Sequence, residues 1–284
     1  MVSALSYLIK KKSELMSTIS HYIFRLFWEL SRRVSYFQNL FRLLPFFTSY
    51  STKNSAEFFG EAIEHYHSNE MRSRFRIYQH CLHKGFNGKI QEFDLGIYFR
   101  KWDNLHSIEK LLITTSYGKI LDIGSNTGYY IPFLMEKGPT TGIEISPKLI
   151  NLARKEGIYN CILGDFFTYK FKNKFDTITL IGNDVALSGT LWRLKKLLKK
   201  LSKLLNKNGQ VLLLIRHIHT LKYWHVVYTP HYNGRFGIPA KYLFLNSQFF
   251  IKLSTKYGFQ ASILGKDIQI QNSFHFIRLI KTSR

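Results

Sequence analysis

Residues 119–128, KILDIGSNTG, limit what this chain can fold into more than any other stretch. A short apolar run that contains Asp122 is followed at once by Gly124 and Gly128, and residues 129–136 are helix-like. An apolar strand, a glycine-bounded loop and a helix in this order are typical of a nucleotide pocket. The glycines let a ligand approach the backbone, and the following helix N-terminus offers unpaired N–H groups.

The spacing of the glycines distinguishes between cofactors. A dinucleotide fingerprint, G-x-G-x-x-G, would need glycine at 126 and 129, where this sequence has Asn126 and Tyr129, so NAD and FAD are disfavoured. The segment instead resembles the first motif of class I S-adenosylmethionine (SAM)-dependent methyltransferases, of the small-molecule type, which is an acid followed by G-x-G-x-G. Asn126 replaces the middle glycine, and asparagine tolerates a left-handed backbone.

From residue 119 the pattern alternates between strand and helix, which predicts an α/β fold with a mostly parallel, Rossmann-like sheet covered by helices on both faces. Two final strands predict an antiparallel edge, an ending that resembles the class I methyltransferases. The stretch 217–238 is interpreted as a long loop or insertion. The expected strands are 119–123, 141–145, 160–163, 175–181, 210–215, 260–264 and 273–280, and the expected helices are 129–136, 147–156, 190–207 and 247–257.

Three regions are predicted: an amphipathic helical extension and linker (1–54), a helical or lid segment (55–113) and a SAM-dependent methyltransferase domain (114–284). The lid segment is expected to be helical from a cap at Ser55 to about Leu82, either continuously or with a break near Ser68-Asn69, and Asn87-Gly88 is expected to be a hairpin turn. Residues 15–44 have a basic polar face, which fits a peripheral membrane anchor, a transit peptide or a stripe that packs on the domain or on a second copy. No transmembrane segment or cleavable signal is predicted.

The resemblance implies that S-adenosylmethionine is the cofactor. Glu144 ends the second expected strand, where a carboxylate can accept hydrogen bonds from both ribose hydroxyls. By resemblance Asp165 accepts from the adenine amino group, Phe166 flanks the ring and Asp122 lies near the methionine amino end. The cofactor-binding residues implied in full are Asp122, Gly124, Asn126, Gly128, Glu144, Asp165, Phe166 and Asn183, the last of which opens onto the transferred methyl group.

Methyl transfer by in-line displacement, which yields S-adenosylhomocysteine (SAH), needs alignment above all, and a base only when the acceptor is protonated. Asp184 and His217 follow strand ends and are the candidate catalytic residues. Tyr98, Arg100 and His219 are the candidate substrate-binding residues. No metal site is predicted, because the histidines and Cys81 of the segment 65–83 lack a second ligand cluster.

The net charge of +23, from 41 basic and 18 acidic residues, is compatible with nucleic acid or an anionic membrane, and equally with a lysine-rich composition. The lead-in segment 93–113, with Tyr98, Phe99 and Arg100, resembles the segment before the first motif of many small-molecule methyltransferases, and no RNA-binding module is recognisable. A small-molecule acceptor is therefore the leading hypothesis. RNA methylation and a membrane-surface or scaffold protein with a non-catalytic SAM-binding domain are the alternatives. Two distant cysteines imply no disulfide framework and fit a cytoplasmic protein, with association at a membrane surface as an option.

Overall fold

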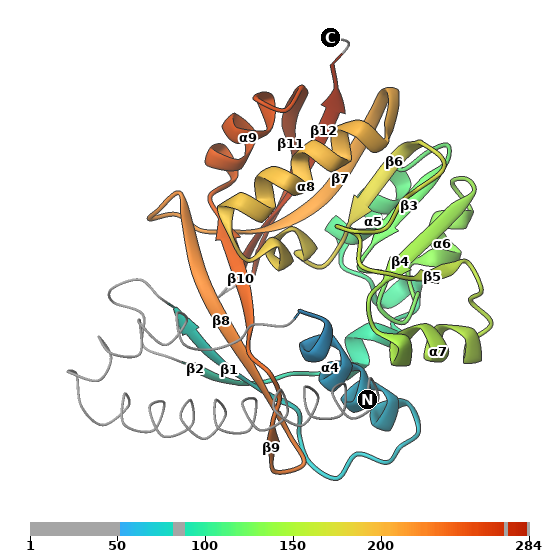
Figure 1. Ribbon diagram of the computed structural model, residues 1–284, viewed down its shortest axis with the longest axis vertical. Helices are drawn as coiled ribbons and strands as arrows, with labels where there is room; N and C mark the ends of the chain where they lie inside the picture. Colours follow the sequence, from blue (N-terminus) through green and yellow to red (C-terminus); the bar gives the residue numbers. More distant parts are fainter. Residues whose placement is uncertain (1–51, 82–88, 270–271, 283–284) are drawn as a thin grey trace, which may run out of the picture.

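The computed structural model describes residues 52–81, 89–269 and 272–282. Its centre is a set of five parallel strands that confirms the predicted Rossmann-like sheet (Figure 1). Continuous apolar runs form these strands because both faces of the sheet are covered. In spatial order they are β5 (Cys161–Leu163), β4 (Thr140–Glu144), β3 (Ile120–Ile123), β6 (Phe175–Leu180) and β7 (Leu205–His217).

The predicted antiparallel edge is also confirmed. β11 (Phe259–Gln269) pairs with β12 (Asn272–Lys281), and β12 pairs antiparallel with β7, from Ser273 opposite His217 to Ile280 opposite Gln210. The strands are longer than the apolar runs that predicted them, because their polar ends continue the same hydrogen-bonded ladder.

The interpretation of 217–238 as a loop is wrong, because this stretch is mostly strand. β8 (Tyr223–Tyr232) turns through Asn233-Gly234 into β9 (Arg235–Phe236), and both turn residues have positive φ, 49° and 69°. Such an Asn-Gly pair is the turn of a two-residue hairpin. β10 (Ala240–Leu245) then pairs antiparallel with β8 and reaches β7 where Leu245 lies opposite His217.

The expected helix of the lid segment is too long. α4 (Thr52–His67) ends where Asn69 takes a positive φ of 55°, and the following residues form β1 (Arg76–Cys81) instead of more helix. β1 pairs antiparallel with β2 (Lys89–Glu92), with Gln79 opposite Lys89, and with β8. The Asn87-Gly88 turn and the amphipathic stretch 15–44 lie outside the described residues.

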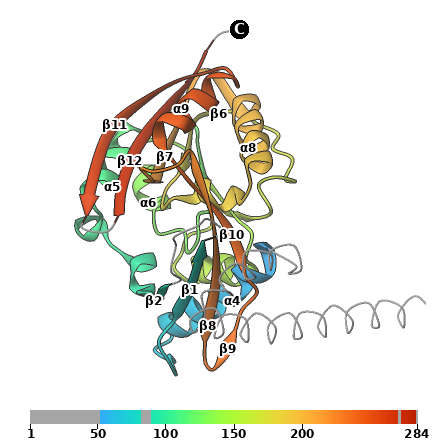
Figure 2. The same ribbon diagram turned by 90° about the vertical axis from the view of Figure 1, so that its left-hand side faces the viewer.

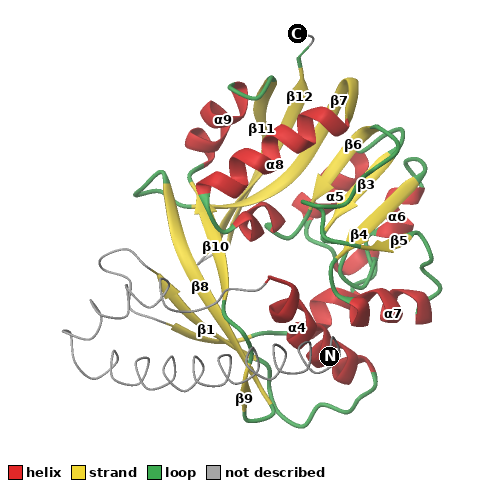
Figure 3. Ribbon diagram, in the orientation of Figure 1, coloured by secondary structure: helices red, strands yellow, loops and turns green. Residues whose placement is uncertain are grey.

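Helices cover both faces of the sheet, as predicted (Figures 2 and 3). On one face α5 (Ser107–Thr115) and α6 (Ile131–Met135) pack on β3 and β7; on the other lie α8 (Leu191–Leu204) and α9 (Ser247–Thr255). The central leucines of the α8 stripe are buried, and its lysines are exposed except for the half-buried Lys200. Thr190 caps this helix by accepting a hydrogen bond from the backbone N–H of Arg193.

α7 (Pro147–Lys155) begins at the predicted cap, where the Ser146 hydroxyl accepts from the Leu149 N–H. Its buried side packs against α4, which lies beside β1 and β8 in the half of the molecule away from the C-terminus (Figure 1). The strands β1, β8 and β10 therefore extend the sheet past the carboxyl ends of β3 and β6. Among the described helices, none combines the length and the apolar composition needed to cross a bilayer.

Candidate active site

A cavity of about 490 Å³ lies at the carboxyl ends of the parallel strands. This volume is within the usual range of small-molecule sites, about 300–1,000 Å³. Its walls come from the glycine loop, from the residues that follow β4, β5 and β6, from the lead-in segment around Tyr98, and from β8 and β10. The site is thus where open α/β sheets bind ligands, with an additional wall that the sheet extension supplies.

The structure brings most of the sequence-predicted site residues to this cavity. Nine line it: Tyr98, Arg100, Gly124, Asn126, Glu144, Asp165, Phe166, Asn183 and Asp184. Four others do not line it: Asp122, Gly128, His217 and His219.

The glycine loop has the predicted backbone. Gly124, Asn126 and Gly128 have φ of 76°, 53° and 77°, so the asparagine takes the left-handed conformation expected of it. A Cβ on Gly124 would lie 3.2 Å from the Asp184 carboxyl carbon, within the cavity wall, whereas one on Gly128 would meet Ile158 and Cys161 at 3.0 and 3.2 Å. The first glycine therefore opens the cavity, and the last lets the loop pack on its neighbours.

Glu144 is buried, and its carboxylate organises the loop. Oε2 accepts from the Asn126 N–H at 3.0 Å, and Oε1 accepts from the N–H groups of Ile145 and Ser146 at 2.7 and 2.9 Å. Burial raises the pKa of Glu144, and the three N–H bonds act against that rise. A carboxylate has about four acceptor positions. The one left over is available to a ligand hydroxyl in the cavity.

Hydrogen bonds within the loop and from α8 hold the Asp165–Phe166 loop in place. Asp165 Oδ1 accepts from the Phe167 N–H at 2.8 Å, and the Lys200 ammonium on α8 donates to the carbonyls of Phe166 and Tyr169. Phe166 lines the cavity but belongs equally to the buried core beside β6. Its ring is thereby held as a rigid apolar surface.

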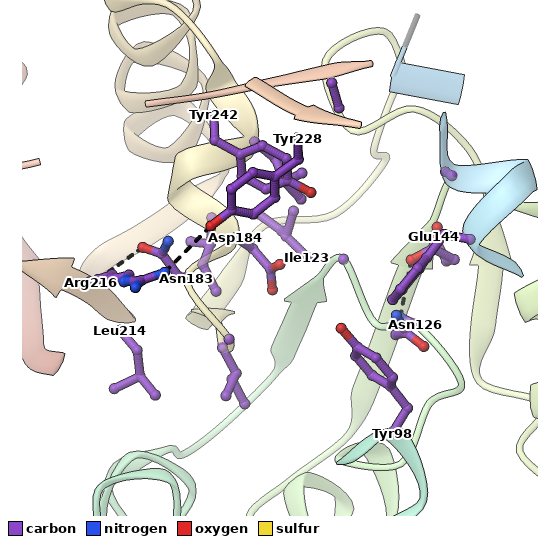
Figure 4. Close-up of a pocket in the computed structure, with 18 of the residues that line it drawn as sticks. Tyr98, Ile123, Asn126, Glu144, Asn183, Asp184, Leu214, Arg216, Tyr228 and Tyr242 are labelled. Atoms are coloured by element: carbon purple, nitrogen blue, oxygen red, sulfur yellow. Dashed lines mark hydrogen bonds between the residues drawn. The ribbon is translucent and has the colours of Figure 1, made fainter. Parts of the chain in front are cut away.

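Asn183 and Asp184 form the wall after β6 (Figure 4). Asn183 has a φ of 73°, and its side-chain Oδ1 accepts from the backbone N–H of Arg216 at 2.9 Å, which ties this turn to β7. Asp184 faces Gly124. Burial in the cavity wall, and next the nearby Asp122 and Glu144, raise the pKa of Asp184 well above its usual range. Such a carboxyl can hold or take up a proton near neutral pH.

The lead-in segment closes one side of the cavity. The Thr127 hydroxyl donates to the Tyr98 carbonyl at 2.5 Å, which joins this segment to the glycine loop. Arg100 forms an ion pair of 2.7 Å with the buried Glu109, whose Oε1 also accepts from the Tyr130 hydroxyl at 2.5 Å. The charge of Arg100 is therefore already paired within the cavity wall.

The two histidines expected at the pocket mouth lie elsewhere. Side chains alternate along a strand, so Leu214 and Arg216 of β7 face the cavity and His217 points to the other face. There its Nδ1 accepts from the Ser247 N–H at 3.1 Å, and its ring stacks on His275 at 4.2 Å. In the part of the chain that is described, no cluster of three or more His, Cys, Asp or Glu residues is placed to hold a metal ion.

Asp122 is buried under the loop rather than at its surface. Its Oδ1 accepts from the Thr179 hydroxyl at 2.6 Å, and burial, opposed by this hydrogen bond, raises the pKa of Asp122 to about 7. In the unfolded chain the carboxyl has its ordinary pKa of 3.8. Between these two values folding retains a proton that the unfolded chain has lost, so stability falls as pH rises through this window.

We expect Asp122→Asn to flatten that pH dependence. The amide carbonyl still accepts from Thr179 and carries no charge, which removes a penalty of at most about 4 kcal/mol above pH 7. Urea unfolding of both proteins at a series of pH values from 4.5 to 8 measures the effect, in the absence of cofactor. Parallel profiles for the two proteins would contradict it.

Among the cavity residues that sequence reasoning missed are Arg216, Tyr228 and Tyr242. The Tyr228 and Tyr242 rings lie 4.4 Å apart, centroid to centroid, and form an aromatic wall. The Asn233-Gly234 pair was a usable signal for the hairpin that carries the first of them. Nothing in the sequence indicated which face of β7 would present Arg216.

The sequence and the fold of this chain are both similar to those of known methyltransferases. Residues 120–209 match the family described as a methyltransferase domain. The fold is similar to that of a SAM-dependent methyltransferase from Bacteroides fragilis in complex with SAH, with 20% identity, a TM-score of 0.68, and coverage of 83% of this chain and 99% of that one. No curated protein sequence gives a match.

Two further solved structures share the fold at lower similarity. The DhpI–SAH complex is 18% identical, with a TM-score of 0.51, and covers 63% of this chain and 83% of its own. CcbJ methyltransferase from Streptomyces caelestis is 9% identical, with a TM-score of 0.50, and covers 62% and 89%. Residues 120–209 thus match a methyltransferase domain, and the fold of the chain is that of solved SAM-dependent methyltransferases.

Proposed function

We propose that this protein transfers the methyl group of SAM to a small molecule that binds in the same cavity. One observation carries the proposal. A single cavity joins the residues suited to a nucleoside, Gly124, Glu144 and Asp165, to a second set formed by Asp184 and the side chains of β7, β8 and β10. We call these two parts the cofactor half and the acceptor half.

The acceptor half supports a small substrate. Its walls are the strands of the sheet extension, with Tyr228 and Tyr242 side by side and Phe244 behind them. The strands cover the carboxyl edge of the sheet, where a polymer substrate would need an open surface. The walls are thus built to surround a molecule of limited size.

In this proposal the cofactor half holds SAM through Glu144 at the ribose and Asp165 at the adenine. The acceptor's lone pair then forms a bond to the methyl carbon, in line with the breaking carbon–sulfur bond, whose electron pair stays on sulfur to give SAH. Positioning supplies much of the rate enhancement. Asp184 lines the cavity beside Gly124, and we assign it the proton that a protonated acceptor loses.

Isotopic labelling tests this function. The protein is incubated with methyl-labelled SAM and a cell extract divided into a low-molecular-weight filtrate, an RNA fraction and a protein fraction. We expect the label in the filtrate and SAH in equal amount. Label only in RNA would favour the alternative motivated by the net charge of +23. SAH binding without label in any fraction would favour a non-catalytic SAM-binding domain.

A further inference from the structure

The acceptor half contains a guanidinium group that no carboxylate neutralises. Arg216 is half-buried near the end of β7 and lines the cavity. Its Nη1 donates to the Tyr228 hydroxyl at 3.4 Å, and its Cζ lies 5.1 Å from the centre of the Phe244 ring. Within the described residues, no Asp or Glu oxygen lies within 4.0 Å of this side chain.

Two other arginines line the cavity. Arg100 is paired with Glu109. Arg193 has no ion pair among the described residues either, but it lies 4.3 Å from the centre of the Phe167 ring, beside the Asp165 loop of the cofactor half. Asp267 also lines the cavity but forms no ion pair with Arg216. Arg216 is therefore the guanidinium of the acceptor half that is open to an external anion.

The backbone fixes this cation relative to the proposed reaction centre. Asn183, whose side chain accepts from the Arg216 N–H at 2.9 Å, directly precedes Asp184. Figure 4 shows Arg216, Asn183 and Tyr228 together on one side of Asp184, with Glu144 and Asn126 on the other. A molecule held at Arg216 would thus lie on the far side of Asp184 from the cofactor residues.

A partly desolvated charge is costly unless it is paired, and a guanidinium matches the two oxygens of a carboxylate or phosphate. We propose that the methyl acceptor bears a carboxylate or phosphate group that pairs with Arg216, and that it is methylated at another atom, which faces Asp184. Tyr228 and Tyr242 flank the body of the molecule between these two points. The inference rests on the proposed function and specifies its substrate class.

The chemical identity of the labelled product gives the first test. Mass spectrometry of the labelled small molecule is expected to show a carboxylate or phosphate group. Arg216→Gln should raise the KM for that acceptor at least about tenfold, with SAH affinity within twofold of the wild type, and Arg216→Lys should recover part of the loss. Arg154→Gln, an exposed arginine on α7, is the matched control and should change neither quantity.

A second readout does not depend on turnover. Benzoate should raise the melting temperature of the SAH-loaded wild type but not of SAH-loaded Arg216→Gln, and the neutral benzamide should do so in neither. A product without a carboxylate or phosphate group, an unchanged KM in Arg216→Gln, or equal responses to benzoate and benzamide would overturn the proposal. Loss of SAH affinity in Arg216→Gln would also overturn it, because the residue would then serve the cofactor. If the wild type labels no small molecule, the proposed function fails, and the benzoate comparison still decides whether Arg216 binds an anion.

Discussion

Gly124→Val is expected to abolish SAH binding, with a loss of affinity of at least about 100-fold. Two causes act together. The φ of 76° is strained for a β-branched residue, and the new Cβ would lie 3.2 Å from the Asp184 carboxyl carbon, with its methyl groups in the space of the cofactor half. Isothermal titration with SAH measures the change.

A matched variant separates these two causes. Gly157 has nearly the same backbone angle, φ 77°, but a Cβ there would meet no atom within 4 Å. Gly157→Val therefore carries the backbone strain without filling the cavity, and it should lose stability while it keeps SAH affinity. If Gly124→Val bound SAH as well as Gly157→Val does, the loop would not border the cofactor.

Asp184→Asn is expected to lower kcat about 10²- to 10⁴-fold for an acceptor that must lose a proton, which is the usual contribution of a general base. The raised pKa of Asp184 gives the reaction a signature. The base acts only when ionised, so activity should rise with pH as Asp184 loses its proton. This acid limb of the pH–rate profile should lie well above the ordinary carboxyl pKa of 3.8. The measurement is the pH profile of label transfer to the small-molecule fraction.

Asp184→Asn should lose the acid limb of the pH–rate profile as well as the greater part of kcat. Asp103→Asn, at an exposed position in the lead-in segment, is the control and should keep both. Asp184→Asn should also keep its SAH affinity, because no step of cofactor binding is assigned to this carboxyl. A variant with the wild-type rate and the wild-type acid limb would exclude Asp184 as the base.

The sequence predicted the parallel sheet and the backbone of the glycine loop well, for a physical reason. Strands buried on both faces are continuous apolar runs, and the loop after β3 needs glycine or asparagine at its left-handed positions. The acceptor half was harder to predict. β8 is rich in tyrosine, histidine and tryptophan, with Val226 and Val227 as its aliphatic residues, so its alternation is weak and it resembles an aromatic loop.

The end of β7, where Arg216 rather than His217 faces the cavity, shows a second limit of prediction from sequence. β7 was expected to end at 215, and His217 and His219 after it were expected at the mouth of the pocket. The strand in fact runs to His217, so consecutive side chains point to opposite faces, and only Arg216 reaches the cavity. The extent of the strand depends on its pairing with β12 and β10, partners remote in sequence, which is why local pattern could not settle it.

The sheet extension has a consequence for how the acceptor range of this protein could diverge. The wall that surrounds the acceptor half is carried by β8 and β10, while the groups around the cofactor half follow β3, β4 and β5 some 60 or more residues earlier. In the proposed function, the residues that recognise the two reactants therefore lie in separate stretches of the chain. Substitutions on the inward side of the hairpin can retune which compound is modified and leave capture of the methyl donor intact.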